Sequence, residues 1–88
     1  MSILKIETAV QASEVFVSDH ELTVRLVDGR TISAPLAWFP RLLHATPLQR
    51  ATWEFLGDGE GIHWPEIDED ISVEGLLAGI PARGAKSK

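Results

Sequence analysis

Apolar and polar residues alternate along the first third of the chain, the pattern expected of antiparallel strands that bury one face. Residues 3–10 and 15–18 follow this pattern, and residues 21–27 show it most clearly, with leucine and valine alternating with threonine and arginine. Asp28-Gly29 predicts a two-residue hairpin turn, because this pair tolerates the positive φ that such a turn needs. Residues 30–34 then form the returning strand, which ends at Pro35 because proline has no N–H for the ladder.

After this proline the large apolar side chains recur at a spacing closer to a helical turn. Pro40 limits where a helix can begin, and a short helix is predicted over residues 41–44. Thr46-Pro47-Leu48-Gln49 is a typical helix start, with threonine as N-cap, proline in the first turn and glutamine completing a capping box. This second helix is expected to run to about Trp53.

Three closely spaced glycines, at positions 57, 59 and 61, favour a turn between two short strands over a continuous helix. The pattern predicts a second β pair from residues 53–56 and 62–64. Pro65 ends this pair, and residues 67–71 are predicted to form a loop that carries carboxylates.

A last short helix is predicted from Ser72, the expected N-cap, to about Gly79. Together these elements predict an α+β fold: a small antiparallel sheet with hairpins, covered by two or three short helices. Residues 1–80 are expected to form one domain, and residues 81–88 a basic flexible tail.

The composition agrees with one small folded domain. The chain has 88 residues, of which 44% are hydrophobic and 24% charged, and it has no cysteine. Disulfides and thiolate metal sites are therefore excluded, and a reducing compartment is the natural setting. The N-terminal residues lack the long apolar stretch of a signal peptide or membrane span, so we expect a cytoplasmic protein that does not contact the membrane.

Charge is distributed unevenly along the chain. The formal net charge is −5, yet residues 54–81 contain eight acidic residues and neither lysine nor arginine. Residues 1–53 are neutral overall, and Arg83, Lys86 and Lys88 make the end of the chain basic. An acidic surface repels the phosphate backbone of nucleic acids and attracts basic partners. We therefore expect a protein partner of basic character and no direct binding of nucleic acid.

Several short motifs occur in the order found in a small bacterial family. They are Asp28-Gly29-Arg30, residues 35–42, Thr46-Pro47, residues 61–65, residues 68–72 and Gly75-Leu76-Leu77. The run from Val24 to Gly79 thus resembles domain of unknown function 2442 (DUF2442). The resemblance implies a compact α+β domain without an established activity. It also implies that some relatives carry a helix-turn-helix domain after it and that others look like one half of a two-gene, antitoxin-like pair. We expect the residues after Gly79 to be too few for a DNA-reading domain of that kind.

Asp68, Glu69 and Asp70 form the densest group of carboxylates. The calcium-binding EF-hand pattern fails here, because Val73 and Gly79 stand where its glycine and closing glutamate should be. We expect Asp68 and Asp70 to accept main-chain N–H bonds that shape the loop, and Glu69 to be solvated. A partner-facing surface and a magnesium site are the alternatives; no metal and no cofactor are predicted.

His63 is the one histidine close to these acids in the sequence. An imidazole at a strand end that donates to a loop carboxylate or carbonyl is the expected arrangement. The alternative is a small metal-binding or hydrolytic protein that uses His63, Asp68 and Asp70. The expected structural motif comprises His63, Trp64, Pro65 and Ser72.

The preferred function is a non-enzymatic interaction or regulatory module, such as the antitoxin-like member of a two-gene bacterial system. No serine lies in a nucleophile motif and cysteine is absent, so nothing predicts catalysis. A DNA-linked regulator without its helix-turn-helix domain is a further alternative, and uncapped strand edges would allow a homodimer. The residues expected to bind a partner are Trp38, Arg41, Glu66, Asp68, Glu69 and Asp70.

Overall fold

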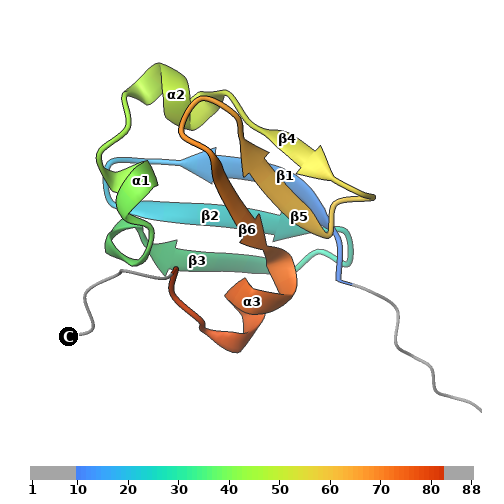
Figure 1. The fold of residues 1–88 in the computed structure, drawn as a ribbon. Helices are drawn as coiled ribbons and strands as arrows, with labels where there is room; N and C mark the ends of the chain where they lie inside the picture. Colours follow the sequence, from blue (N-terminus) through green and yellow to red (C-terminus); the bar gives the residue numbers. More distant parts are fainter. Residues whose placement is uncertain (1–9, 83–88) are drawn as a thin grey trace, which may run out of the picture.

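The computed structural model describes residues 10–82, which form two antiparallel three-stranded sheets and several short helices (Figure 1). The first sheet has the order β1-β2-β3 and the second the order β4-β5-β6. The predicted α+β class is therefore confirmed, with two small sheets in place of one. Most of the strand predicted over residues 3–10, and residues 83–88 of the tail, lie outside the described residues. The elements are β1 (Ala12–Val17), β2 (Glu21–Leu26), β3 (Thr31–Pro35), η1 (Leu36–Trp38), α1 (Pro40–Leu43), α2 (Pro47–Ala51), β4 (Glu54–Leu56), β5 (Gly61–Trp64), β6 (Glu69–Ser72) and α3 (Val73–Ala78).

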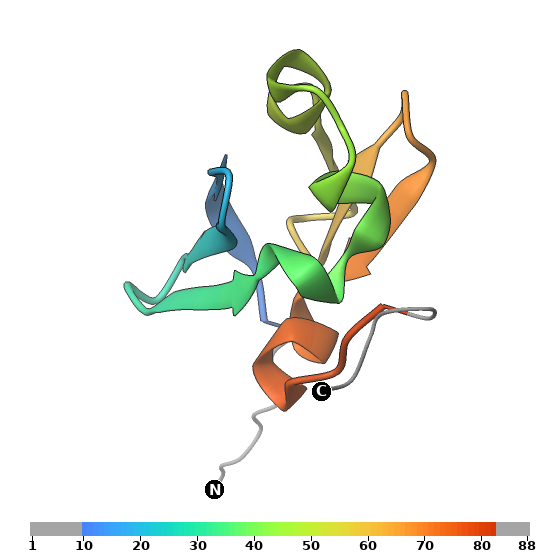
Figure 2. The ribbon, with the colours of Figure 1, turned by 90° about the vertical axis from the view of Figure 1, so that its left-hand side faces the viewer.

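The core lies between the two sheets. Figure 2 shows the sheets on opposite sides of the molecule, with the helical segment η1–α1 between them and α3 at one end. Alternate residues of β2 point into this core, as the sequence pattern predicted, and Trp64 of β5 is its largest fully buried side chain. A main-chain hydrogen bond joins the two sheets: Ala12 N–H of β1 donates to the carbonyl of Gly59, in the turn between β4 and β5, at 2.7 Å. A second one joins η1 to the first sheet, because Leu36 N–H donates to the carbonyl of His20, in the turn between β1 and β2, at 2.9 Å. No helix within residues 10–82 has the length and apolar character needed to cross a bilayer.

The hairpin between β2 and β3 has a three-residue loop, so the predicted two-residue turn is wrong. Leu26 N–H donates to the Arg30 carbonyl at 2.7 Å, and Gly29 N–H donates to the Leu26 carbonyl at 3.0 Å. Val27 therefore belongs to the loop and not to the strand. Gly29, with φ 99°, takes the left-handed position that follows the tight turn in loops of this length.

Residues 69–72 form a strand, which corrects the loop predicted over residues 67–71. Asp68 adopts φ 54° in the turn after Pro65, and the chain then pairs with β5. Glu69 and Ile71 are buried, whereas Asp70 and Ser72 are exposed, so the segment alternates with a period of two. The acidic residues made this alternation hard to recognise in the sequence, because acidic residues are depleted in strands and favour loops.

Side-chain caps fix the starts of two helices as predicted. The Thr46 hydroxyl accepts from Gln49 N–H at 3.1 Å, and the Gln49 side chain accepts from Thr46 N–H at 2.9 Å. This capping box begins α2, which ends at Ala51, two residues before the predicted end. Ser72 caps α3 by accepting from Gly75 N–H at 3.1 Å, and the helix is followed by Gly79 in the left-handed conformation.

Candidate functional site

Two rows of side chains cross the solvent-facing side of the second sheet. The register pairs His63 of β5 with Glu54 of β4 and Asp70 of β6. In the next outward-facing row, Gly61 lies between Leu56 and Ser72. Ile62, Trp64 and Ile71 point to the other side, into the core. We call the outer side of this sheet the outer face; its residues are Glu54, Leu56, Gly61, His63, Asp70 and Ser72.

On the outer face, Nδ1 of His63 contacts Oδ1 of Asp70. Val73 N–H donates to the Glu60 carbonyl at 3.0 Å, so these two residues form a hydrogen-bonded pair next to β5 and β6. Hydrogen-bonded and non-hydrogen-bonded pairs alternate along antiparallel strands, and His63–Asp70, three pairs further along, is therefore a non-hydrogen-bonded pair. Side chains of such pairs approach most closely. The hydrogen bond with Asp70 raises the pKa of His63, the charges of Asp70, Glu54 and Asp68 add to the rise, and partial burial opposes it.

His63 therefore contacts a carboxylate, as expected, and this contact corrects the role predicted for Asp70. The Asp70 carboxylate pairs with the imidazole, whereas a bond from main-chain N–H groups was expected. The reason is that Asp70 lies within a strand, where its side chain points away from the main chain of its own segment and toward the neighbouring strand.

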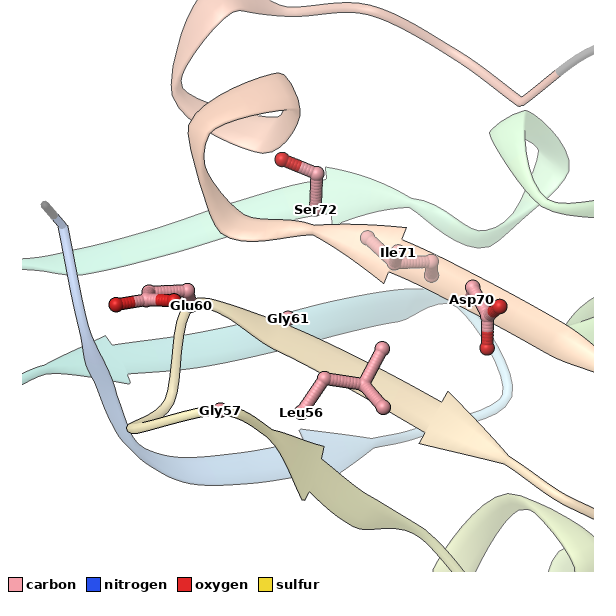
Figure 3. Close-up of a pocket in the computed structure, with 7 residues that line it drawn as sticks. All are labelled: Leu56, Gly57, Glu60, Gly61, Asp70, Ile71 and Ser72. Atoms are coloured by element: carbon pink, nitrogen blue, oxygen red, sulfur yellow. The ribbon is translucent and has the colours of Figure 1, made fainter.

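A hollow of about 390 Å³ lies beside this pair on the outer face (Figure 3). It forms because Gly61 has no side chain to fill the space between Leu56 and Ser72. Leu56 lines the hollow and is 41% exposed. Figure 3 shows Glu60 and Asp70 at opposite ends of the hollow. The site thus combines an apolar centre with carboxylates at its rim.

Glu69 is buried, which corrects the prediction that it is solvated. It lies opposite Trp64 on the core side of the sheet, and burial raises the pKa of its carboxyl group, although the charge of Arg41 opposes the rise. Arg41 Nη1 lies 3.9 Å from Glu69 Oε1 and also donates to the main-chain carbonyl of Asp68. Arg41 thus joins α1 to the turn between β5 and β6.

The other predicted partner-binding residues are dispersed. Trp38 is half-buried, contacts Phe39 edge-on with ring centroids 6.5 Å apart, and its carbonyl accepts from Ala82 N–H at 3.0 Å. Glu66 and Asp68 are exposed in the turn between β5 and β6. Of the predicted set, only Asp70 belongs to the outer face. Across residues 10–82, no three histidine, aspartate or glutamate side chains are grouped so as to hold a metal ion.

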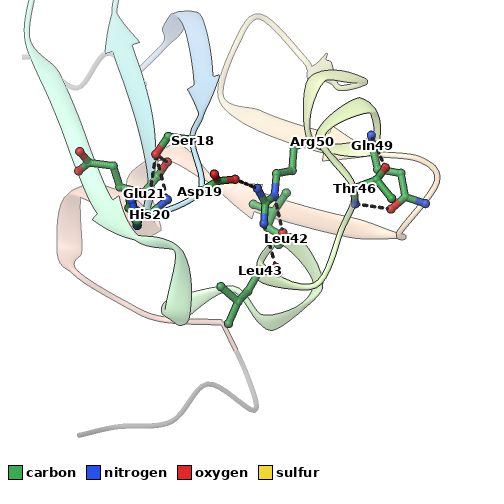
Figure 4. A network of polar contacts seen from close by, with 9 residues as sticks. All are labelled: Ser18, Asp19, His20, Glu21, Leu42, Leu43, Thr46, Gln49 and Arg50. Atoms are coloured by element: carbon green, nitrogen blue, oxygen red, sulfur yellow. Dashed lines mark hydrogen bonds and ion pairs between the residues drawn. The ribbon is translucent and has the colours of Figure 1, made fainter.

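Arg50 is the main structural residue that the sequence did not reveal (Figure 4). Its side chain is 10% exposed and donates to the carbonyls of Leu42 (3.0 Å) and Leu43 (2.9 Å) at the end of α1. It also donates to Asp19 at 2.8 Å. Carbonyls at a helix end need donors, and an arginine soon after a short helix was the available signal. Leu56 and Gly61 were missed too, because Gly61 was assigned to the turn before the strand, whereas it is the first residue of β5.

The fold recurs in two solved structures. The crystal structure of a protein of unknown function from Rhodospirillum rubrum is similar with a TM-score of 0.73 and 32% identity, over 89% of this chain and 96% of that one. The solution structure of an uncharacterised protein from Chromobacterium violaceum has a TM-score of 0.70 and 22% identity, over 84% and 70%, and so shows the fold alone. No curated protein matches the chain. The family model for proteins of unknown function DUF2442 matches residues 12–82, and the chain belongs to that family.

Proposed function

We propose that this protein is a non-enzymatic interaction module that binds a basic protein partner through the outer face. The observation that supports this most directly is the hollow at Gly61, where half-exposed Leu56 lies between the carboxylates of Glu60 and Asp70. Protein interfaces commonly have such an apolar centre with a polar rim. From residue 54 to residue 82 there is neither lysine nor arginine to neutralise these acids, so their field attracts positively charged surfaces.

The chemistry around His63 supports binding over catalysis. A histidine paired with a carboxylate can act as a general base when a nucleophile lies within hydrogen-bond reach. The nearest outward-facing hydroxyl in the sheet belongs to Ser72, which caps α3. This hydroxyl is thereby held at the helix start, and cysteine is absent from the chain. The His63–Asp70 pair then serves to order the surface that a partner meets.

We further propose that the protein is the regulatory or antitoxin-like member of a two-protein system in the bacterial cytoplasm. The family resemblance motivates this role, since it implies that some relatives look like one half of a two-gene pair. The lack of cysteine agrees with a reducing compartment. The expected partner is the basic member of the pair.

The experiment is co-purification of the tagged protein from cells of its source, compared with two charge-reversal variants. Asp70→Lys changes the outer face, and Glu21→Lys makes the same charge change at an exposed position of the first sheet. The wild type and Glu21→Lys should retain one basic protein in stoichiometric amount, and Asp70→Lys should lose it. A wild type that purifies repeatedly without a partner would contradict the proposal, as would a partner that Asp70→Lys retains.

A further inference from the structure

Strand β6 separates the hollow at Gly61 from a second hollow of about 170 Å³. This second hollow lies between β6 and the segment of residues 80–82 that follows α3, and Asp70, Ile71 and Ser72 line both hollows. Its walls include the apolar side chains of Phe39 and Leu76. The volume is smaller than that of usual small-molecule sites, about 300–1,000 Å³, and suits a single long side chain.

Glu69 lines this second hollow, and residues 10–82 form no hydrogen bond to its carboxylate. The residue is only 8% exposed and its side chain 11% exposed, and its one ion pair among residues 10–82 is with Arg41. Arg41 Nη1, the paired cation, is 3.9 Å away, beyond the range of a hydrogen bond. Buried ionised carboxylates normally have both a counter-charge and hydrogen bonds. Glu69 therefore keeps acceptor capacity for a further cationic donor.

The main chain of β6 adds polar groups beside this carboxylate. β6 is an edge strand of the second sheet, and Asp70 occupies a non-hydrogen-bonded position opposite β5. The N–H and C=O groups of Asp70 therefore face away from β5, toward the open edge. A side chain that enters the hollow thus meets an apolar wall, a buried carboxylate and the outward-facing main-chain groups of an edge strand.

We propose that the second hollow receives an arginine side chain of the partner, whose guanidinium group pairs with Glu69 while its methylene groups pack on Phe39 and Leu76. This inference rests on the proposed function and names the anchor that the basic partner supplies. Arginine fits better than lysine, because its planar group binds a carboxylate through two hydrogen bonds and is more weakly hydrated. Its long aliphatic stem can cover apolar surface while the charged end forms the ion pair.

The test is an NMR titration of the isotope-labelled full chain with N-acetyl-arginine amide, and with the amide of N-acetyl-citrulline as a neutral control of similar shape. The arginine amide should give saturable shifts at the amides of residues 69–72 and 80–82. The citrulline amide should bind at least tenfold more weakly, since it lacks the charge that pairs with Glu69. This comparison needs no variant, so it does not depend on how a substitution affects folding.

Variants locate the binding site. Glu69→Gln should abolish the response, and Glu74→Gln, an exposed change on α3, should keep it. Equal shifts with citrulline, the absence of saturable shifts, or an unchanged response in Glu69→Gln would overturn the inference. Arg83 follows Ala82, which lines the same hollow, so the titration is repeated with Arg83→Ala. Binding that appears only in that variant would assign the hollow to the chain's own arginine and overturn the partner assignment.

The outcomes also separate this inference from the proposed function. A basic partner that is lost from Asp70→Lys but fully retained by folded Glu69→Gln would overturn the arginine anchor and leave the proposed interaction in place. Specific binding of arginine amide by a protein that purifies without a partner would overturn the proposed interaction and leave the arginine-binding hollow in place.

Discussion

The indole N–H of Trp64 donates a 3.0 Å hydrogen bond to the main-chain carbonyl of Arg50, and this bond ties the second sheet to helix α2. The Arg50 side chain in turn donates to the last carbonyls of α1. Three elements that are separate in sequence therefore meet at one buried arginine. Because β5 carries both Trp64 on its core side and His63 on the outer face, this junction also holds the candidate site in place.

Arg50 should contribute much more to stability than its ion pair suggests. Arg50→Met leaves the carbonyls of Leu42 and Leu43 without their donor, and we expect the free energy of unfolding to fall by about 2–4 kcal/mol. Asp19→Asn, which weakens only the pair with an 82% exposed carboxylate, should cost less than about 1 kcal/mol. Denaturant unfolding measures both changes. Equal losses for the two variants would show that the ion pair, and not the carbonyl bonds, carries the effect.

Two glycines with similar backbone angles should respond differently to alanine. Gly59 and Gly29 have φ of 95° and 99°, so alanine is strained at either position, by about 1–2 kcal/mol. A Cβ at Gly59 would also lie 2.6 Å from the Ala12 carbonyl oxygen, whereas at Gly29 nothing lies within 4 Å. Thermal unfolding should therefore show Gly59→Ala to be less stable than Gly29→Ala by more than about 1 kcal/mol. Similar stabilities would mean that the contact between the β4–β5 turn and β1 is loose.

Local signals in the sequence predicted most elements of the fold, but the β2–β3 turn, strand β6 and the role of Arg50 were missed. Alternation identified β2, and capping residues identified the starts of α2 and α3, because these features depend on neighbouring residues. β6 was missed because three acidic residues obscured its period of two. Arg50 was missed because its acceptors belong to a different helix, so its position soon after α1 did not by itself identify the bonds to the carbonyls of Leu42 and Leu43.

The candidate site was only partly predictable for a similar reason. The sequence grouped His63 with Asp68 and Asp70 as an alternative site, and it predicted that His63 contacts a carboxylate or a carbonyl. It could not show that Leu56, Gly61 and Ser72 form one row, because a shift of one residue in strand register would send these side chains to the opposite face. The burial of Glu69 depends on the same register, which directs it to the core side beside Trp64.

The His63–Asp70 contact should make stability depend on pH. The folded-state pKa of His63 is raised above its ordinary value of about 6.5, so the contact stabilises the protein fully below that pH and is lost as the pH rises through the folded-state pKa. The free energy of unfolding should therefore decline as the pH rises above about 6.5 and through the raised folded-state pKa of His63. His63→Gln and Asp70→Asn should both reduce this decline, and His20→Gln, at an exposed turn, should preserve it. An identical slope in His63→Gln would show that another group titrates.

Glu69 should produce a pH dependence of its own. Because burial raises its folded-state pKa, the native protein binds this proton more tightly than the unfolded chain, and stability falls as the pH rises from about 4.3 through the raised pKa. Glu69→Gln removes that loss, so its stability relative to wild type should improve as the pH rises above about 4.3 and through the raised pKa of Glu69. Exposed Glu74→Gln should show no such trend. A relative stability that instead worsens with rising pH would mean that the attraction to Arg41 outweighs burial.

The proposed function requires that the outer face is the surface that binds the partner. The most direct measurement is the dissociation constant of the purified partner for wild type, Asp70→Lys and Glu21→Lys, by titration calorimetry at one fixed salt concentration. We expect Asp70→Lys to weaken binding at least tenfold, about 1.4 kcal/mol, and Glu21→Lys to leave it within a factor of two to three. Equal affinities for the two variants, or a larger loss in Glu21→Lys, would contradict the assignment of the outer face.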